Sequence, residues 1–245
     1  SFTQDIEIEF TIPYAEIPNF PVSTVQGHKG ALVFGKIGTK SVVAMQGRFH
    51  FYEGYDMKTV TFPVRVMKYL GVNKLIVSNA SGGVNPNYKV GDVVLIKDHI
   101  NFFPDHPLRG TNDDRFGPRF VNMSEPYSRS LMKRAKEIAL QNEIDLKEGI
   151  YLGLQGPTFE TLAEYKMVKN VGADCVGMST VPEVIAAKHA GLEVAGVSFI
   201  SNKAAGLSSG PLTHEEVSEN AALVEKRFGA LMERFISLVL EEKDG

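Results

Sequence analysis

The sequence predicts a single α/β domain, with a mixed, largely parallel twisted β-sheet flanked by helices. Three observations lead to this prediction: the length of 245 residues, the absence of a linker-like stretch, and the alternation of strand-like with helix-like segments. A chain of this length fits one domain of generous size. Strands that alternate with helices typically form a parallel or mixed sheet, which the helices cover on both faces.

Short runs rich in β-branched residues are the expected strands. Several of them are apolar on both faces, as in a sheet buried between two layers of helices. They span residues 31–34, 41–45, 75–77, 93–96, 150–154, 175–178 and 194–200.

Helical patterns lie between these strands. The first is expected over 57–70, where Pro63 marks a kink or a late start. Two more are expected over 127–141 and 161–171. A long irregular stretch, residues 101–124, is rich in Pro, Asp, Asn and Arg. A loop of that length in a compact domain is usually functional or interfacial.

The two helices nearest the C-terminus have the clearest start signals. Thr180 and Glu183 are spaced as a capping box, and Gly191 would end the helix that they open. Thr213 and Glu216 form a second box, which precedes a regular apolar stripe.

Composition narrows the class of protein. Lys and Arg number 26 against 29 Asp and Glu, a net charge of −3, so a basic nucleic-acid footprint is not expected. With 43% hydrophobic residues the chain is ordinary globular protein, and no apolar run approaches the roughly 20 residues of a membrane span. Cys175 is the single cysteine, which makes a reducing, cytoplasmic location the simplest expectation.

Three stretches that follow strands could bind an anion. Residues 78–84, Ser-Asn-Ala-Ser-Gly-Gly-Val, could form a nest of backbone N–H groups, although a tight strand exit is by itself the more common explanation. Ser179 lies at a helix N-terminus, a ready phosphate site, although Thr180 alone explains the cap. Arg48 could clamp a phosphate and His50 could add a second donor, or both could lie in a solvated loop.

Two further stretches contain side chains that could bind an aromatic heterocycle. Phe159 could stack on a ring whose N–H the Glu160 carboxylate accepts, although Glu is also favoured at a helix start. Asn202, at the end of a strand, could read a purine edge, or could simply lie in a turn. His214, in the first turn of the last expected helix, is most simply an exposed helix residue.

The sequence lacks the motifs of several other common classes of enzyme and binding site. The sequence contains no P-loop, no dinucleotide fingerprint and no Gly-x-Ser-x-Gly elbow. One cysteine and scattered histidines do not give the ligand spacing of a zinc site. The residues therefore indicate an anion and an aromatic heterocycle bound at the carboxyl ends of strands.

Ordered motifs from about Ile12 to the final helix carry a family resemblance. They lie at residues 16–21, 27–28, 45–55, 79–86, 98–101, 112–117, 156–160, 176–184 and 201–203. In these stretches the sequence resembles the trimeric purine nucleoside phosphorylases, the family that acts on 6-oxopurine nucleosides. The resemblance implies the nucleoside phosphorylase fold and reversible phosphorolysis in purine salvage. It implies no metal or organic cofactor, inorganic phosphate as co-substrate, and a homotrimer.

The resemblance also implies a role for each motif residue. The phosphate ligands would be Arg48, His50, the Ala80 backbone and Ser179, with His28 nearby. The ribose would contact Tyr52, Met178 and His214. The purine would contact Tyr151, Phe159, Glu160, Val176 and Asn202. Phe120 would reach into the site of a neighbouring subunit.

The implied mechanism has no covalent enzyme intermediate. The glycosidic bond stretches to an oxocarbenium-like centre, and phosphate attacks C1′ from the opposite face with inversion. The implied catalytic residues are Asn202, which would stabilise the departing purine at N7 and O6, Glu160, which would fix N1–H, and His50. Such catalysis consists mostly of positioning and electrostatic stabilisation.

Two departures from the family pattern stand out. Ser1 follows directly on the position of the family's Gly-Ser-Gly-Leu-Gly phosphate loop. The domain over 1–245 is therefore expected to be N-terminally incomplete, with about 30 residues more in the working protein, the size of a βαβ-type unit. Ser201 stands where the family often has Thr.

Two alternatives to the implied function are weighed. A methylthioadenosine phosphorylase is disfavoured, because those enzymes carry Asp at the position of Asn202. A catalytically dead nucleoside-binding protein is the alternative from another class, and an inosine assay with and without phosphate separates it from the enzyme.

Overall fold

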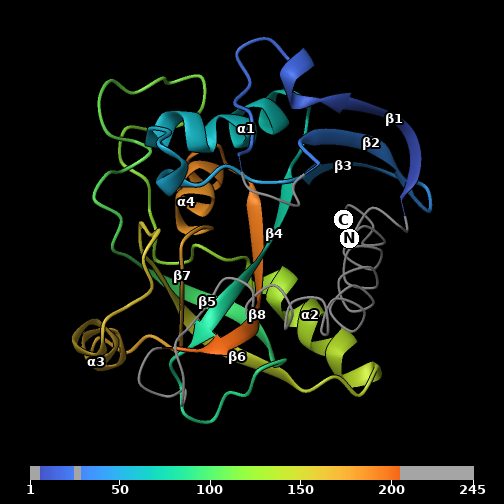
Figure 1. Cartoon of the computed structure of the whole chain (residues 1–245). Coiled ribbons are helices and arrows are strands. Elements are labelled where there is room, and N and C mark those ends of the chain that lie inside the picture. Colours follow the sequence, from blue (N-terminus) through green and yellow to red (C-terminus); the bar gives the residue numbers. More distant parts are fainter. Residues whose placement is uncertain (1–5, 25–28, 205–245) are drawn as a thin grey trace.

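The computed structural model describes residues 6–24 and 29–204, and its centre is a closed β-barrel (Figure 1). In spatial order the barrel strands are β4 (Lys74–Gly83), β7 (Cys175–Gly177), β6 (Leu146–Gly153), β5 (Val93–Asn101) and β8 (Glu193–Lys203). The β4–β8, β5–β6 and β6–β7 pairs are parallel, whereas β4–β7 and β5–β8 are antiparallel. The predicted mixed, largely parallel sheet is confirmed, and its closure into a barrel was not predicted.

A second, antiparallel sheet lies outside the barrel, at the blue end of the chain in Figure 1. Its order is β1 (Glu7–Pro13), β2 (Ala31–Ile37) and β3 (Lys40–Gln46). The prediction treated β2 and β3 as part of the main sheet and gave no strand at β1. Phe10 of β1 stacks on Phe34 of β2 with ring centroids 4.6 Å apart.

Four α-helices are described: α1 (Met57–Tyr69), α2 (Arg129–Gln141), α3 (Leu162–Asn170) and α4 (Val181–His189). All four were predicted, and α1 already begins at Met57, so that Pro63 lies inside it rather than at a late start. Two short 3-10 helices, Tyr14–Glu16 and Phe51–Glu53, complete the elements of this part of the chain. None of its helices is long and apolar enough to cross a membrane.

The main core joins α4 to the barrel. Val181, Val184 and Ala187 of α4 are completely buried, together with Tyr151 of β6 and Cys175 of β7. Helix α1 packs alongside α4, and α2 packs against β5 and β8 (Figure 1). Because β7 ends at Gly177 and α4 begins at Val181, this core fixes the short link between them.

An aromatic cluster supports the segment that follows β3. Phe49 is 3% exposed, and its ring lies 5.1 Å from that of Tyr14 and 5.8 Å from that of Phe20. The Tyr14 hydroxyl donates to the Gly47 carbonyl at 2.9 Å. Phe49, which lies between Arg48 and His50 in the sequence, is thereby anchored in the core. Because successive side chains of extended backbone point to opposite sides, Arg48 and His50 point away from this cluster.

The stretch 78–84 corrects one prediction. It was expected as a Gly-rich turn after a short strand, but β4 continues to Gly83, with a register shift after Ser81. The glycines serve close strand packing: a Cβ on Gly83 would lie 3.0 Å from Ile200 of β8, and one on Gly82 would lie 3.5 Å from Val176 of β7. The chain turns only after β4, where the N–H of Tyr88 donates to the Asn85 carbonyl.

The long irregular region is tied to α1 and α4. Arg65 of α1 donates to Nδ1 of His189 at 2.7 Å, and the Nε2 atom of that ring lies 3.1 Å from the Asn112 side-chain oxygen. Arg65 also lies over the ring of Phe116, 4.8 Å from its centroid. Burial and the charge of Arg65 both lower the pKa of His189, in keeping with a neutral ring that accepts at one nitrogen and donates at the other.

Candidate active site

Arg48 brings together the three stretches that the sequence marks as anion-binding. Its Nε donates to both carboxylate oxygens of Glu183, at 3.0 and 3.2 Å, and another guanidinium nitrogen donates to the Ser78 carbonyl at 2.8 Å. The segment after β3, the middle of β4 and the first turn of α4 therefore meet at one guanidinium. The side chains of this ion pair are 19% and 13% exposed, so that solvent screens it less than it screens a surface pair.

His50 is held by one carboxylate. Glu53 accepts from the His50 backbone N–H at 2.7 Å and lies 2.9 Å from Nδ1 of the ring. Burial, and then the charge of Arg48, lower the pKa of His50 to about 4. The neutral ring therefore carries its proton on Nδ1, facing Glu53, and Nε2 is an acceptor. The donor predicted from the sequence at Nε2 would require the protonated ring.

Ser179 occupies the link between β7 and α4. Its backbone N–H donates to the Tyr151 hydroxyl at 3.3 Å, and its own hydroxyl lies 3.1 Å from that of Thr180. The predicted capping box of Thr180 and Glu183 is present, with the Thr180 N–H donating to Glu183 at 3.1 Å. Burial raises the pKa of Tyr151 to about 12, which keeps its hydroxyl protonated.

Ala80 lies within β4, opposite Phe199 of β8. Alternate residues of a strand turn their backbone N–H and C=O groups to the same side. The Ala80 N–H therefore faces the side of β4 on which Arg48 binds the Ser78 carbonyl. This places the predicted backbone donor on the side of β4 that Arg48 covers.

The residues assigned to the purine fall into two groups. Val176 and Asn202, 3% and 5% exposed, both lie opposite Gly82 in the barrel register. The Asn202 amide accepts from the Ser201 hydroxyl at 2.8 Å and donates to the Lys203 carbonyl at 3.2 Å. Phe159 and Glu160, half-buried, lie in the loop between β6 and α3.

Two details refine this purine set. Burial is the main cause that raises the pKa of Glu160 above its usual value. Tyr151, which the resemblance places on the purine, is completely buried and meets Ser179 through its hydroxyl.

Two of the residues assigned to the ribose meet at Gly156. A Cβ on Gly156 would lie 2.5 Å from the Met178 sulfur and 3.1 Å from the Tyr52 ring, and the φ of 65° is one that glycine tolerates best. The Tyr52 ring also stacks on His50, with centroids 4.7 Å apart. His28 and His214, assigned to phosphate and ribose, lie outside the described residues.

Phe120 lies in the long loop, remote in sequence from these groups. It is 88% exposed, and the guanidinium of Arg119 lies 5.5 Å from the centre of its ring. A ring exposed to this extent is available to another surface.

Sequence reasoning did not assign Glu183 and Glu53 as the partners of Arg48 and His50. Glu183 was recognised only as half of a capping box, because its partner Arg48 lies 135 residues away. The i, i+3 spacing of His50 and Glu53 was the signal that could have identified the second pair.

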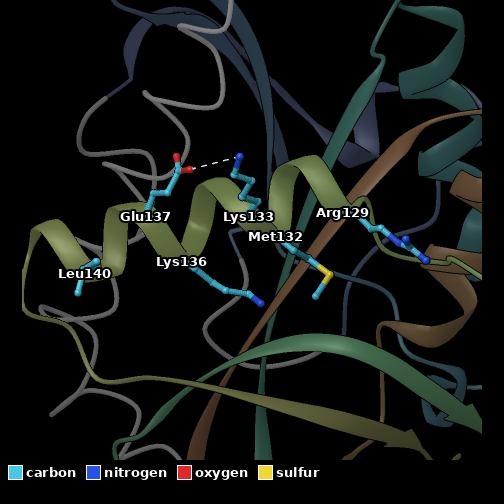
Figure 2. A pocket seen from close by; sticks show the side chains of 6 residues that line it. All are labelled: Arg129, Met132, Lys133, Lys136, Glu137 and Leu140. Atoms are coloured by element: carbon cyan, nitrogen blue, oxygen red, sulfur yellow. Dashed lines mark ion pairs between the residues drawn. The ribbon is translucent and has the colours of Figure 1, made fainter.

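A hollow of about 400 Å³ lies elsewhere, on the surface of α2 (Figure 2). Six side chains of this one helix line it: Arg129, Met132, Lys133, Lys136, Glu137 and Leu140. None of the residues predicted for the site contributes to it. Within 6–24 and 29–204, no group of three or more His, Cys, Asp or Glu side chains is placed to hold a metal ion.

Comparison with known proteins gives consistent matches. The model of the Phosphorylase superfamily matches residues 3–237. Purine nucleoside phosphorylase 1 of Geobacillus stearothermophilus is 54% identical over 91% of this chain and 82% of its own length. Purine nucleoside phosphorylase of Bos taurus is 52% identical over 94% of this chain and 81% of its own length.

A solved structure agrees in fold as well as in sequence. The purine nucleoside phosphorylase of Schistosoma mansoni in complex with inosine superimposes with a TM-score of 0.93 at 42% identity. That match covers 100% of this chain and 88% of the other. This chain therefore belongs to the phosphorylase superfamily, and within it to the purine nucleoside phosphorylases.

Proposed function

We propose that this protein catalyses the reversible phosphorolysis of purine ribonucleosides and deoxyribonucleosides such as inosine and guanosine, in purine salvage. The C1′–N9 bond breaks, a C1′–O bond to phosphate forms, and the proton of hydrogen phosphate ends on the base, so that the products are the free base and (deoxy)ribose 1-phosphate. The observation that carries this proposal is the meeting of three anion-binding stretches at Arg48. Relatives at about half identity over most of the chain are named purine nucleoside phosphorylases.

Phosphate binds beside Arg48, His50, the Ala80 N–H and Ser179, with His28 as a further ligand. The Arg48 guanidinium supplies positive charge, while the neutral Nε2 of His50 accepts the one proton that hydrogen phosphate carries. The Glu53 carboxylate holds the imidazole in the tautomer that this contact requires. Bound in this way, phosphate presents an unprotonated oxygen to C1′.

The purine is bound by Asn202 and Glu160, with Val176 and Phe159 around it, while the completely buried Tyr151 contacts Ser179 instead. The Asn202 amide stabilises charge at O6 and N7 as the glycosidic bond breaks, and Glu160 accepts N1–H. The Ser201 hydroxyl supports this geometry, because it donates to the Asn202 oxygen and thereby fixes which end of the amide donates. Tyr52, Met178 and His214 contact the ribose.

The remaining proposals concern the protein in the cell. The reaction needs no metal or organic cofactor, because positioning and charge stabilisation carry it. The enzyme is cytoplasmic and assembles as a homotrimer, and support for the assembly comes from the exposed ring of Phe120. The alternative, a nucleoside-binding protein without turnover, has the same purine contacts and differs only in the chemistry.

A coupled spectrophotometric assay of hypoxanthine release from inosine tests the function. Release that depends on phosphate supports the enzyme, and nucleoside binding without release supports the binding protein. An Arg48→Gln variant is the control, since it removes the charge of the phosphate ligand and leaves the purine side unchanged.

A further inference from the structure

A chain of buried side-chain hydrogen bonds leads from the barrel to Ser179. The Ser81 and Ser198 hydroxyls lie 2.6 Å apart, and Ser198 donates to the Asn79 side-chain oxygen at 2.6 Å. The Asn79 amide nitrogen donates to the Thr180 hydroxyl at 2.8 Å, which in turn lies 3.1 Å from that of Ser179. Ser81, Ser198, Asn79 and Thr180 are between 0% and 7% exposed. Polar groups buried this deeply are costly unless they are all paired.

Thr180, in the middle of this chain, has a strained backbone. Its φ of 70° and ψ of −52° fall in the left-handed half of the map, which a β-branched residue rarely adopts. The Val181 N–H donates to the Ser179 carbonyl at 2.7 Å, so Thr180 is the centre of a γ-turn of the rare, strained kind. Such strain persists only where surrounding contacts enforce it, and it clusters at functional sites.

The direction of the hydrogen bonds is fixed along the chain. The Ser198 hydroxyl donates its one proton to the Asn79 oxygen, so the Ser81 hydroxyl must donate to that of Ser198. The Thr180 hydroxyl accepts from the Asn79 amide and, in the capping box, from the Glu183 backbone N–H, so its own proton is left for the Ser179 oxygen. Every bond of this series therefore donates towards Ser179, and none of these bonds uses the proton of the Ser179 hydroxyl. Bonds aligned in this way polarise one another.

We propose that Asn79 is a positioning residue for phosphate: it holds the γ-turn at Thr180 and orients the Ser179 hydroxyl as a donor to the anion. This inference rests on the proposed function, and it assigns to a buried barrel residue a part in phosphate binding. Both polar ends of the Asn79 side chain are bonded within the protein, to Thr180 and to Ser198. Its neighbour Ala80 faces the phosphate side of β4, while its own side chain is directed to α4.

The test measures the KM for phosphate and the KM for inosine separately in each variant. Asn79→Leu and Thr180→Val interrupt the series of hydrogen bonds but keep a similar side-chain volume. In both variants the KM for phosphate should rise about tenfold, the scale of one hydrogen bond to a charged group. The KM for inosine should stay within about twofold. A general loss of structure would instead raise the KM values for both phosphate and inosine. Thr180→Ser keeps the hydroxyl and should restore the phosphate KM.

Binding of phosphate alone provides a second readout. Inorganic phosphate should raise the Tm of the wild-type protein, and this shift should shrink in Asn79→Leu and Thr180→Val. Thr61→Val is the matched control: it deletes a hydroxyl that is also buried, 2% exposed, but that bonds only within α1. It should leave both KM values unchanged.

Three results decide the matter. A phosphate KM that is unchanged, or that rises together with the inosine KM, in folded Asn79→Leu and Thr180→Val overturns the inference. If these variants do not fold, Ser198→Ala, which deletes a single oxygen, must show the same split, and its absence overturns the inference equally. A wild-type protein without phosphate-dependent hypoxanthine release contradicts the proposed function itself, which is a separate outcome.

Discussion

The Asn202 amide has one fixed orientation. Ser201 can give a proton to the Asn202 oxygen, and the Lys203 carbonyl can only receive one from the amide nitrogen. The donor and the acceptor of the side chain are thereby assigned before any base arrives. In the proposed binding mode, O6 of a 6-oxopurine accepts from the amide N–H, whereas a 6-amino group would meet a second donor and no acceptor.

Asn202→Asp should therefore change the choice of base. A carboxylate accepts from a 6-amino group and repels O6, so kcat/KM for inosine should fall by roughly 100-fold, the scale of an unpaired buried polar contact, while the ratio of adenosine to inosine turnover rises. Steady-state kinetics with both nucleosides measure this ratio. Asn202→Ala is the control that should weaken both. A parent protein that already prefers adenosine would contradict the assignment.

Residue types could be predicted for the site, but not their partners. The sequence marked Arg48, His50, Ser179 and Asn202 because their chemistry and their places after strands are local facts. Asn79 contacts Thr180 across 101 residues of chain. Such a pairing depends on how the barrel closes, and no spacing in the sequence encodes it.

At the scale of elements, two adjacent glycines in β4 have different neighbours. A Cβ on Gly82 would lie 3.3 Å from the Asn202 amide nitrogen, whereas one on Gly83 would lie 3.0 Å from the Ile200 side chain. Gly82 therefore borders Asn202 and with it the proposed purine site, and Gly83 borders the core.

This difference predicts opposite outcomes for two matched variants. Gly82→Ala should displace the Asn202 amide and lower kcat/KM for inosine by about tenfold, with little change in stability. Gly83→Ala should overpack the core and lower the free energy of unfolding by about 1–3 kcal/mol, with a smaller kinetic effect. Urea unfolding and inosine kinetics of both variants give the comparison. Equal losses of activity and stability in the two would show that the glycines do not divide these roles.

The elements themselves were largely predictable, and their assembly was not. The helices could be predicted because their apolar stripes and caps are local in the sequence. The main strands could be predicted because runs of β-branched residues are local as well. β1 was missed although Ile8, Phe10 and Ile12 alternate with polar residues, the usual signal of a half-buried strand. The Gly-rich end of β4 resembled a turn because the strands that pack against it are distant in the sequence.

At the scale of the molecule, buried histidines make stability depend on pH. Burial lowers the pKa of both His50 and His99 to about 4, with the Arg48 charge adding to the effect at His50. Between about pH 6.5 and 4 the unfolded chain therefore binds more protons than the folded one, and stability falls as the pH falls.

The Tm should accordingly drop as the pH is lowered through this window. His99→Phe keeps a ring against Tyr127, whose ring centroid is 5.8 Å from that of His99, and removes one of the groups that titrate in this window. The Tm of this variant should fall less steeply between pH 6.5 and 4, as thermal unfolding at several pH values would measure. Parallel Tm profiles for variant and parent would contradict the assignment.

Assembly can be tested through Phe120. If its ring enters a neighbouring site, light scattering should give a trimer, and Phe120→Ala should weaken assembly and lower kcat/KM for inosine by about tenfold or more, as expected for a buried aromatic anchor. Leu140→Ala is the control, because Leu140 is 82% exposed on α2. A fully active monomer would refute this prediction.

Barrel closure also dictates an order of events during synthesis. β4 (Lys74–Gly83) pairs with β8 (Glu193–Lys203), so a strand made early must wait for one made more than a hundred residues later. Contacts of this separation slow folding, because the entropy of closing the loop is lost before the pairing compensates for it. A nascent chain that has not yet released Lys203 from the ribosome presents β4 and β5 with unpaired backbone edges. Chaperone capture during translation is expected to be concentrated on that interval, and to end when β8 emerges.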